Sequence, residues 1–146
     1  MNTKGETINS ILNGLHIPKD RYIHITHYIQ QVIRDYKENP IDIIREIPFN
    51  LKGNERYLTM FIIGRYFSPL FYKMDDKEKT DFIVNMANAL KFSDERVATI
   101  AEYMITIKNE MRENVPIIDI IKMIINSKFI DVEKDYITFI FGLVLV

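Results

Sequence analysis

The chain has 146 residues, of which 47% are hydrophobic and 27% charged, so its length and composition are those of one ordinary globular domain. Its formal net charge of −1 gives no electrostatic reason to expect a nucleic acid or an anionic membrane as a partner. Because the chain has no cysteine, disulfides, thiolate metal sites and cysteine nucleophiles are excluded.

The first third of the chain predicts short amphipathic helices separated by prolines. Apolar residues recur every three or four positions over 3–15, and again over 18–38. The second stretch places its apolar stripe opposite a polar face that carries His24 and His27. A two-turn helix is expected over 41–47, so we expect a set of N-terminal helices within residues 1–47.

Residues 48–54 form the strongest break in the pattern. The segment, PFNLKGN, combines glycine, proline and two asparagines, which favour turns. About 50 residues of short helices would bury too little surface to be stable alone. We therefore interpret 48–54 as a loop inside a single domain, 1–146, whose main bundle is 55–146.

The next predicted helix follows directly, with Asn54 as its expected N-cap. This helix is apolar nearly all round, and Arg65 is its only charge between Arg56 and Lys73. Such a helix belongs at the centre of a bundle. Pro69 is expected to kink or split it, because proline lacks a backbone donor and clashes with the preceding turn.

Two more helices are predicted from their first residues. Asp75 and Asp76 favour a helix start, and Ser93 is placed to cap the helix after it. The second of these helices has a seam of apolar residues at alternating steps of three and four, over two heptads. Two heptads are too few for an independent coiled coil, so the seam predicts an antiparallel neighbour inside the bundle. The seam residues are Val97, Ile100, Met104, Ile107 and Met111.

The C-terminal part predicts two further apolar segments, 117–125 and 131–146. The β-branched and aromatic residues of 137–146 also suit a strand, but no second strand is evident to pair with it. We expect helix there. The predicted fold is therefore all-α: a compact antiparallel multi-helix bundle of six to eight helices with short loops.

Arg65 is the first candidate ligand-binding residue, because a charge in an apolar helix needs a partner. An internal pocket with Tyr66 and Tyr103 could hold an anion or a carboxylate against it. The alternatives are an internal ion pair, or a side chain that reaches solvent along its aliphatic stem.

His24 and His27 are weak metal candidates. Histidines three positions apart on one helix face can share a metal ion. The same face is the polar side of the helix, so the alternative is a pair of solvent-exposed side chains. The sequence shows no third or fourth ligand, and no histidine has a glutamate three positions earlier, as di-iron bundles require. We expect no cofactor.

The apolar surplus of the C-terminal segments predicts association. A terminal helix that is apolar all round must either cross the core or cover a partner, and a symmetric homodimer is the commonest solution. We therefore expect a homo-oligomer interface within 117–146. Its candidate residues are Ile117, Ile120, Ile121, Ile124, Phe139, Phe141, Leu143 and Leu145.

These patterns favour binding over catalysis. The five glycines form no phosphate-binding loop, and the chain contains no Gly-x-Ser-x-Gly nucleophile motif. We expect a soluble, cytoplasmic, non-enzymatic interaction or regulatory protein that self-associates or binds another protein. We expect neither a nucleic acid nor a membrane as its partner. The alternative is a ligand-binding or enzymatic domain that uses the pocket near Arg65.

Overall fold

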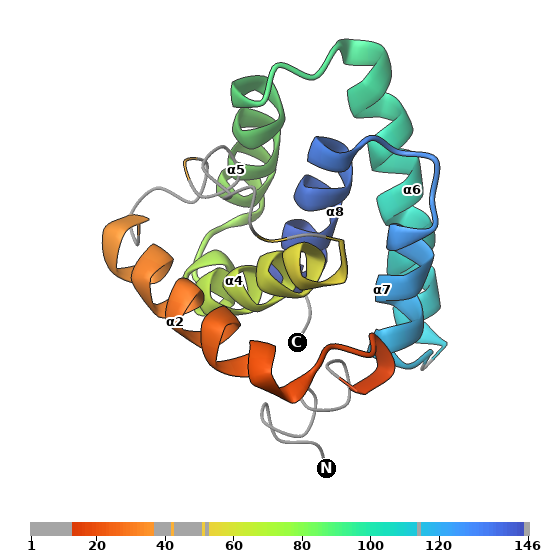
Figure 1. Ribbon diagram of the computed structural model, residues 1–146. Helices are drawn as coiled ribbons and strands as arrows, with labels where there is room; N and C mark the ends of the chain where they lie inside the picture. Colours follow the sequence, from red (N-terminus) through yellow and green to blue (C-terminus); the bar gives the residue numbers. More distant parts are fainter. Residues whose placement is uncertain (1–12, 37–41, 43–50, 52, 114, 145–146) are drawn as a thin grey trace.

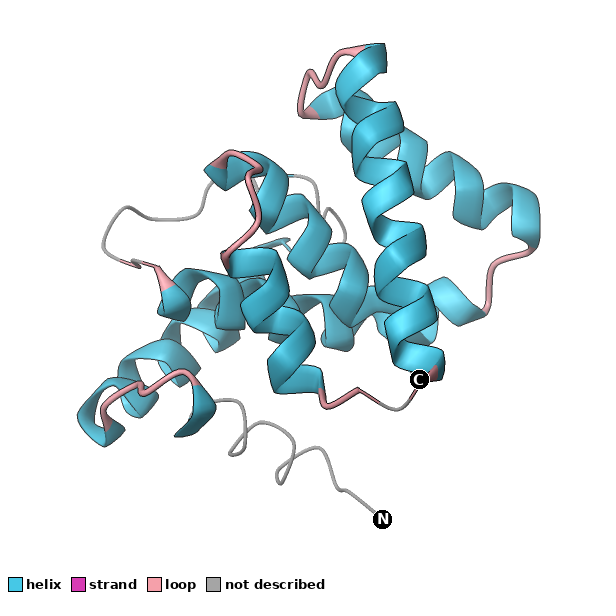
Figure 2. Cartoon of the chain, turned by 90° about the vertical axis from the view of Figure 1, so that its right-hand side faces the viewer, coloured by secondary structure: helices cyan, strands magenta, loops and turns pink. Residues whose placement is uncertain are grey.

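The computed structural model describes residues 13–36, 42, 51, 53–113 and 115–144, and every regular element within them is a helix (Figures 1 and 2). The all-α prediction is confirmed, and residues 137–144 are helical rather than extended. The helices expected within 3–15 and 41–47 lie largely outside the described residues. The described helices are α2 (Lys19–Tyr36), α4 (Asn54–Tyr72), α5 (Asp76–Ala89), α6 (Asp94–Arg112), α7 (Ile117–Ile125) and α8 (Asp131–Val144).

The predicted starts of α5 and α6 are confirmed. Asp75 accepts a hydrogen bond from the backbone N–H of Glu78, and the Glu78 carboxylate accepts one from the backbone N–H of Asp75. This reciprocal capping box satisfies two backbone donors that a helix start otherwise leaves unpaired. The Ser93 hydroxyl accepts a hydrogen bond from the backbone N–H of Arg96 in the same way.

The start of α4 differs from the prediction by one residue. Asn54 is the first residue of the helix rather than its N-cap, and Gly53 precedes it with a φ of 51°. A positive φ costs glycine little, which explains why glycine occupies the turn. The Asn54 side chain donates to the carbonyl of Leu15 at 3.2 Å and so joins the N-terminal segment to α4. Pro69 does not split the helix, which continues to Tyr72.

Helices α4 and α8, called the central pair below, form the core of the fold (Figure 1). They approach closely enough that glycine is required at the contact. A Cβ atom added to Gly64 would lie 2.2 Å from the carbonyl oxygen of Phe139. One added to Gly142 would lie 2.3 Å from the carbonyl oxygen of Phe61. The two backbones therefore touch at this crossing with no side chain between them.

The two helices of the central pair run in the same direction. Arg56 in the first turn of α4 bonds Asp135 near the start of α8, and Tyr72 at the end of α4 donates to the carbonyl of Val144 at the end of α8.

Helices α5 and α6, called the arm below, are less buried than the central pair. Ten of the 19 residues of α4 and ten of the 14 residues of α8 are buried. In α5 only Met86 and Ala87 are buried, and in α6 only Ile100 and Ile107. The arm therefore leaves one of its sides open, and the groove described next lies there.

Candidate docking groove

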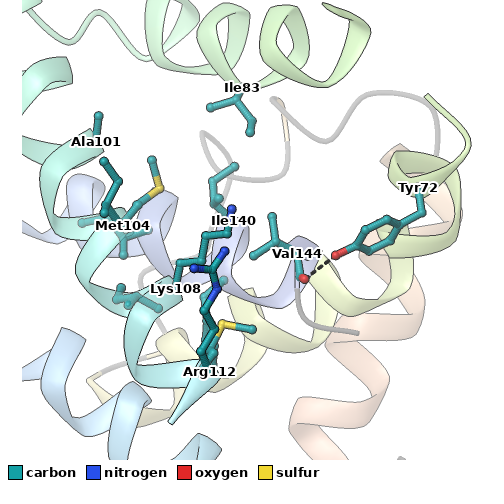
Figure 3. Close-up of a pocket in the computed structure, with 13 residues that line it drawn as sticks. Tyr72, Ile83, Ala101, Met104, Lys108, Arg112, Ile140 and Val144 are labelled. Atoms are coloured by element: carbon teal, nitrogen blue, oxygen red, sulfur yellow. Dashed lines mark hydrogen bonds between the residues drawn. The ribbon is translucent and has the colours of Figure 1, made fainter. Parts of the chain in front are cut away.

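A groove of about 690 Å³ lies between the arm and α8 (Figure 3). Tyr72 lines it from the end of α4, and Ile83 lines it from α5. The volume falls in the range of roughly 300–1,000 Å³ that is usual for ligand sites. Most of its lining is apolar, so water gains little by filling it.

Two helical stripes form the walls of the groove. The lining residues of α8, called the α8 stripe, are three, one and three positions apart in the sequence. Those of the α6 stripe are also spaced by steps of three and one, over three turns. This spacing places each set on one face of its helix. The α8 residues are Ile137, Ile140, Phe141 and Val144, and the α6 stripe consists of Ala101, Met104, Ile105, Lys108, Met111 and Arg112.

The α6 wall carries part of the heptad seam recognised in the sequence. Met104, Ile107 and Met111 of the seam line the groove, and only Ile107 among them is buried. Ile105 lies beside them with 60% of its surface exposed, which is unusual for isoleucine. The seam thus meets α8 along one side and faces open space along the other.

Lys108 and Arg112 are the charged residues among the described residues that line the groove, and none of those described lining residues is acidic. They lie one helical turn apart on α6, and both are exposed. In Figure 3 their nitrogen ends lie between Met104 and Val144. Neither side chain makes a salt bridge or hydrogen bond with the described part of the chain.

Tyr72 fixes the end of the groove that α4 contributes. Its hydroxyl donates to the carbonyl oxygen of Val144, one of the acceptors that the end of α8 leaves without a helical partner (Figure 3). Burial raises the pKa of Tyr72, and the positive charge of Arg65 opposes that rise. The hydroxyl therefore stays protonated and holds the ends of α4 and α8 together.

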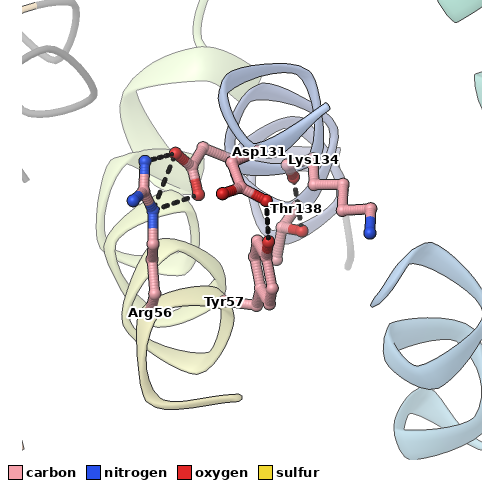
Figure 4. Close-up of polar contacts among 6 residues, drawn as sticks. Arg56, Tyr57, Asp131, Lys134 and Thr138 are labelled. Atoms are coloured by element: carbon pink, nitrogen blue, oxygen red, sulfur yellow. Dashed lines mark hydrogen bonds and ion pairs between the residues drawn. The ribbon is translucent and has the colours of Figure 1, made fainter. Parts of the chain in front are cut away.

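The α8 wall is held in place by a buried ion pair (Figure 4). The Asp135 side chain is 0% exposed, and Arg56 Nε donates to both of its carboxylate oxygens at 2.9 and 3.0 Å. Burial raises the pKa of Asp135, and the hydrogen bonds from Arg56 oppose that rise. Tyr57 donates to Asp131 at 3.2 Å in the same cluster, and burial raises the pKa of Tyr57 to about 12.

A second ion pair joins the arm to α8. Arg96 at the start of α6 donates from Nε and Nη2 to the two carboxylate oxygens of Glu133, at 2.7 and 2.8 Å. These hydrogen bonds lower the pKa of Glu133. The planar fork of arginine matches a carboxylate in this bidentate geometry, which fixes orientation as well as distance. The pair therefore joins the start of α6 to the start of α8.

The predicted ligand residues Arg65, Tyr66 and Tyr103 lie on two helices and do not line this groove. Arg65 is half-buried on α4, and Tyr66 beside it is 47% exposed. Tyr103 lies on α6 with its ring 5.0 Å from that of Phe129. Burial raises the pKa of Tyr103, and its buried hydroxyl has no hydrogen bond of ordinary geometry. A shared anion site for the three residues stays a prediction.

His24 and His27 are both exposed on the polar face of α2, as the sequence predicted. Among the described residues, no three histidine or acidic side chains are grouped closely enough to hold a metal ion. His27 lines a smaller groove of about 230 Å³ together with Tyr22, Ile23, Thr26 and Gln30.

The residues that suggested a homo-oligomer interface are mostly inside the fold of the single chain. Ile117 is half-buried, and Leu145 lies outside the described residues. The apolar surplus of 117–144 is therefore used largely to build the core of the single chain. Self-association and the interface expected at these residues stay predictions. Of the eight candidate interface residues, six are at most 2% exposed: Ile120, Ile121, Ile124, Phe139, Phe141 and Leu143.

Two features were not predicted from the sequence: the two acidic residues that fix α8, and the open side of the α6 seam. Glu133 and Asp135 are carboxylates at the start of an otherwise apolar segment, and that position was a signal that they need partners. The seam residues were recognised, but their pattern alone does not tell a filled face from an open one.

No helix of the described ranges combines the length and the apolar character that crossing a membrane requires. Comparison with known proteins found no match to the chain among family models, curated proteins or solved structures.

Proposed function

We propose that this protein is a non-enzymatic interaction protein that binds an amphipathic α-helix of a partner protein in the groove between α5, α6 and α8. The observation that supports the proposal is the pair of helical stripes on α6 and α8, which line an open and largely apolar space. Ridges of side chains at spacings of three and four interdigitate with those of another helix. A third helix in this space would cover both stripes.

Exposure along the α6 stripe supports a protein partner. Ile105 is 60% exposed, and the Ala101 side chain on the same stripe is also exposed. Exposed apolar residues that form one continuous patch mark association sites, whereas scattered ones do not. A helix docked along α6 would remove this patch from water at about 25 cal/mol for each Å² of apolar surface.

Flexible side chains in the groove fit the same role. Met104 and Met111 are both half-buried on the α6 wall. Methionine has three rotatable bonds and a polarisable sulfur, so it adapts to ligand side chains of different shapes. Amphipathic helices commonly bind in grooves of this kind, with apolar anchors at positions i, i+3, i+4 and i+7.

The test uses a designed peptide of 18 residues, with leucine at the anchor positions and glutamine at the others. Fluorescence anisotropy of the labelled peptide is measured against the full chain. We expect saturable binding, weakened at least tenfold by Ile105→Glu, because that substitution places a charge inside the contact. The matched control is Ile23→Glu on α2, where Ile23 is 66% exposed outside the groove. It should leave binding unchanged.

Three outcomes contradict the proposal. The first is absence of saturable binding to the unmodified protein, and the second is equal weakening by Ile105→Glu and Ile23→Glu. The third is saturable binding of dodecanoate without binding of the peptide, which would replace the helix with a small amphiphile. Circular dichroism of each variant establishes that the helical fold is retained.

A further inference from the structure

We infer that the helix bound in the groove is acidic, with two carboxylates about one turn apart that meet Lys108 and Arg112. This inference rests on the proposed function and adds the chemistry that selects the partner. Of the 13 described residues that line the groove, these two are charged and both are positive. An apolar groove with charges of one sign favours a ligand that carries the opposite sign.

Three arginines of the described chain form ion pairs with carboxylates, and Arg112 does not form such a pair with a described residue. Arg21 holds Glu55 at 2.8 and 3.0 Å, and Arg56 and Arg96 hold Asp135 and Glu133 in the same forked way. Each of these arginines uses its guanidinium inside the fold to join two elements.

Arg112 lines the groove and makes no such pair with a described residue. Its fork is therefore available to a carboxylate that comes from outside.

The spacing of the two cations sets the geometry of the partner. Lys108 and Arg112 are four residues apart on α6, so they lie on one face about one turn from each other. A helix lying along α6 places its own residues at the same repeat, so acidic residues three or four apart meet both cations. The two carboxylates would flank the leucine-like anchors rather than interrupt them.

The two positive charges, rather than the apolar lining, determine which amphipathic helices this groove selects. The apolar lining includes Met104 and Met111, which adapt to many side chains and so discriminate weakly. Like charges brought together at a contact are repelled, so a basic amphipathic helix is disfavoured at Lys108 and Arg112. The pair therefore separates acidic from basic helices that have equal apolar faces.

The test uses three versions of the 18-residue peptide, which differ at two flanking positions four residues apart. These positions carry glutamate in one version, glutamine in the second and lysine in the third. At low salt we expect the glutamate peptide to bind about fivefold to tenfold more tightly than the glutamine peptide, and the lysine peptide to bind most weakly. The preference should shrink at 0.5 M salt, where charges are screened over about 4 Å.

The variant protein carries Lys108→Met and Arg112→Met together. We expect it to bind the glutamate and glutamine peptides with equal affinity, because the two charges that distinguish these peptides are gone. The matched control is Lys77→Met with Lys122→Met, which removes two exposed positive charges on α5 and α7 outside the groove. It should retain the preference for glutamate.

The outcomes separate this inference from the function on which it rests. If the unmodified protein binds the glutamate and glutamine peptides equally, the inference is overturned and the groove keeps its proposed function. If the preference survives in the Lys108→Met and Arg112→Met protein, or disappears in the control, the groove cations are not its source and the inference fails. If none of the three peptides binds, both proposals fail.

Discussion

The central pair and the arm are built from similar lengths of helix but differ in what their side chains do. In the central pair, α4 and α8 bury ten residues each and touch backbone to backbone at Gly64 and Gly142. In the arm, α5 and α6 bury two residues each, and much of the apolar surface of α6 borders the groove. The difference indicates that stability resides in the central pair, while the arm carries the groove for which we propose a binding role.

The largest effect is expected from Arg56→Met in the central pair. The substitution leaves the buried carboxylate of Asp135 without its positive partner, which costs about 3–5 kcal/mol of unfolding free energy. The pKa of Asp135 is already raised by burial, so this loss should grow as pH rises and shrink as acid protonates the carboxyl group.

Urea unfolding between pH 4 and pH 8 measures the effect of Arg56→Met. The double variant with Asp135→Leu is the control, and it should recover much of the loss because no buried charge remains. A loss below 1 kcal/mol at pH 8 would show that the central pair does not depend on this ion pair.

Gly64→Ala is expected to have the next largest effect. Its new methyl group would lie 2.2 Å from the carbonyl oxygen of Phe139, a backbone atom that cannot move alone. Forcing the helices apart should cost about 3 kcal/mol, although alanine in a helix is otherwise more stable than glycine by about 1 kcal/mol.

Gly53→Ala is the matched control for Gly64→Ala. Nothing lies within 4 Å of an added Cβ at Gly53, so only its φ of 51° opposes the substitution. That loss should be about 1–2 kcal/mol. Thermal unfolding of both variants measures the two losses of stability. Equal losses would show that the close crossing of α4 and α8 does not require glycine at position 64.

Glu133→Gln tests the link between the arm and the central pair, and its effect should be smaller. The hydrogen bonds from Arg96 lower the pKa of Glu133 below its ordinary value of 4.5, so the folded state favours the ionised carboxylate. This contribution is fully present above about pH 4.5 and is lost as pH falls through the lowered pKa.

The urea midpoints of the unmodified protein and of Glu133→Gln should therefore differ at pH 7 and converge near pH 3. A difference that stays constant over this pH range would assign the loss to packing instead of charge. Peptide binding at pH 7 should weaken in the same variant, since the ion pair joins α6 to α8, the two walls of the groove.

Ile105→Glu should have the smallest effect on stability. The side chain is 60% exposed, so the change in unfolding free energy should stay within about 0.5 kcal/mol. Urea unfolding beside the peptide titration shows whether loss of binding occurs without loss of stability. A destabilisation above 1 kcal/mol would mean that Ile105 supports the fold of the arm.

Much of the fold was predictable from local signals. Asp75 and Ser93 begin their helices through hydrogen bonds to residues within four positions, so the local sequence is sufficient to predict these helix starts. The apolar character of α4 indicated its central place, because few of its positions are suited to water. The helical state of 137–144 followed from the lack of a second strand.

The groove was not predictable, because it depends on how distant segments meet. Arg56 and Asp135 are 79 positions apart, and nothing local to either residue selects the other. Phe139 and Phe141 were expected at an interface by the rule that surplus apolar surface covers a partner. In the single chain the Gly64 crossing lets α8 bury both residues in the core. The open surface lies on α6, whose heptad seam predicted a neighbour inside the bundle but not how much of the seam that neighbour covers.

The reciprocal contact at Gly64 and Gly142 also constrains how this fold can diverge. A side chain at either position would strike the backbone of the other helix, so neither helix can compensate by changing its own surface residues. Relatives too distant to share an overall resemblance should retain two glycines at these places, inherited together. Such a coupled pair, with an arginine and an aspartate about two turns before the respective glycines, would serve as an anchor for aligning them.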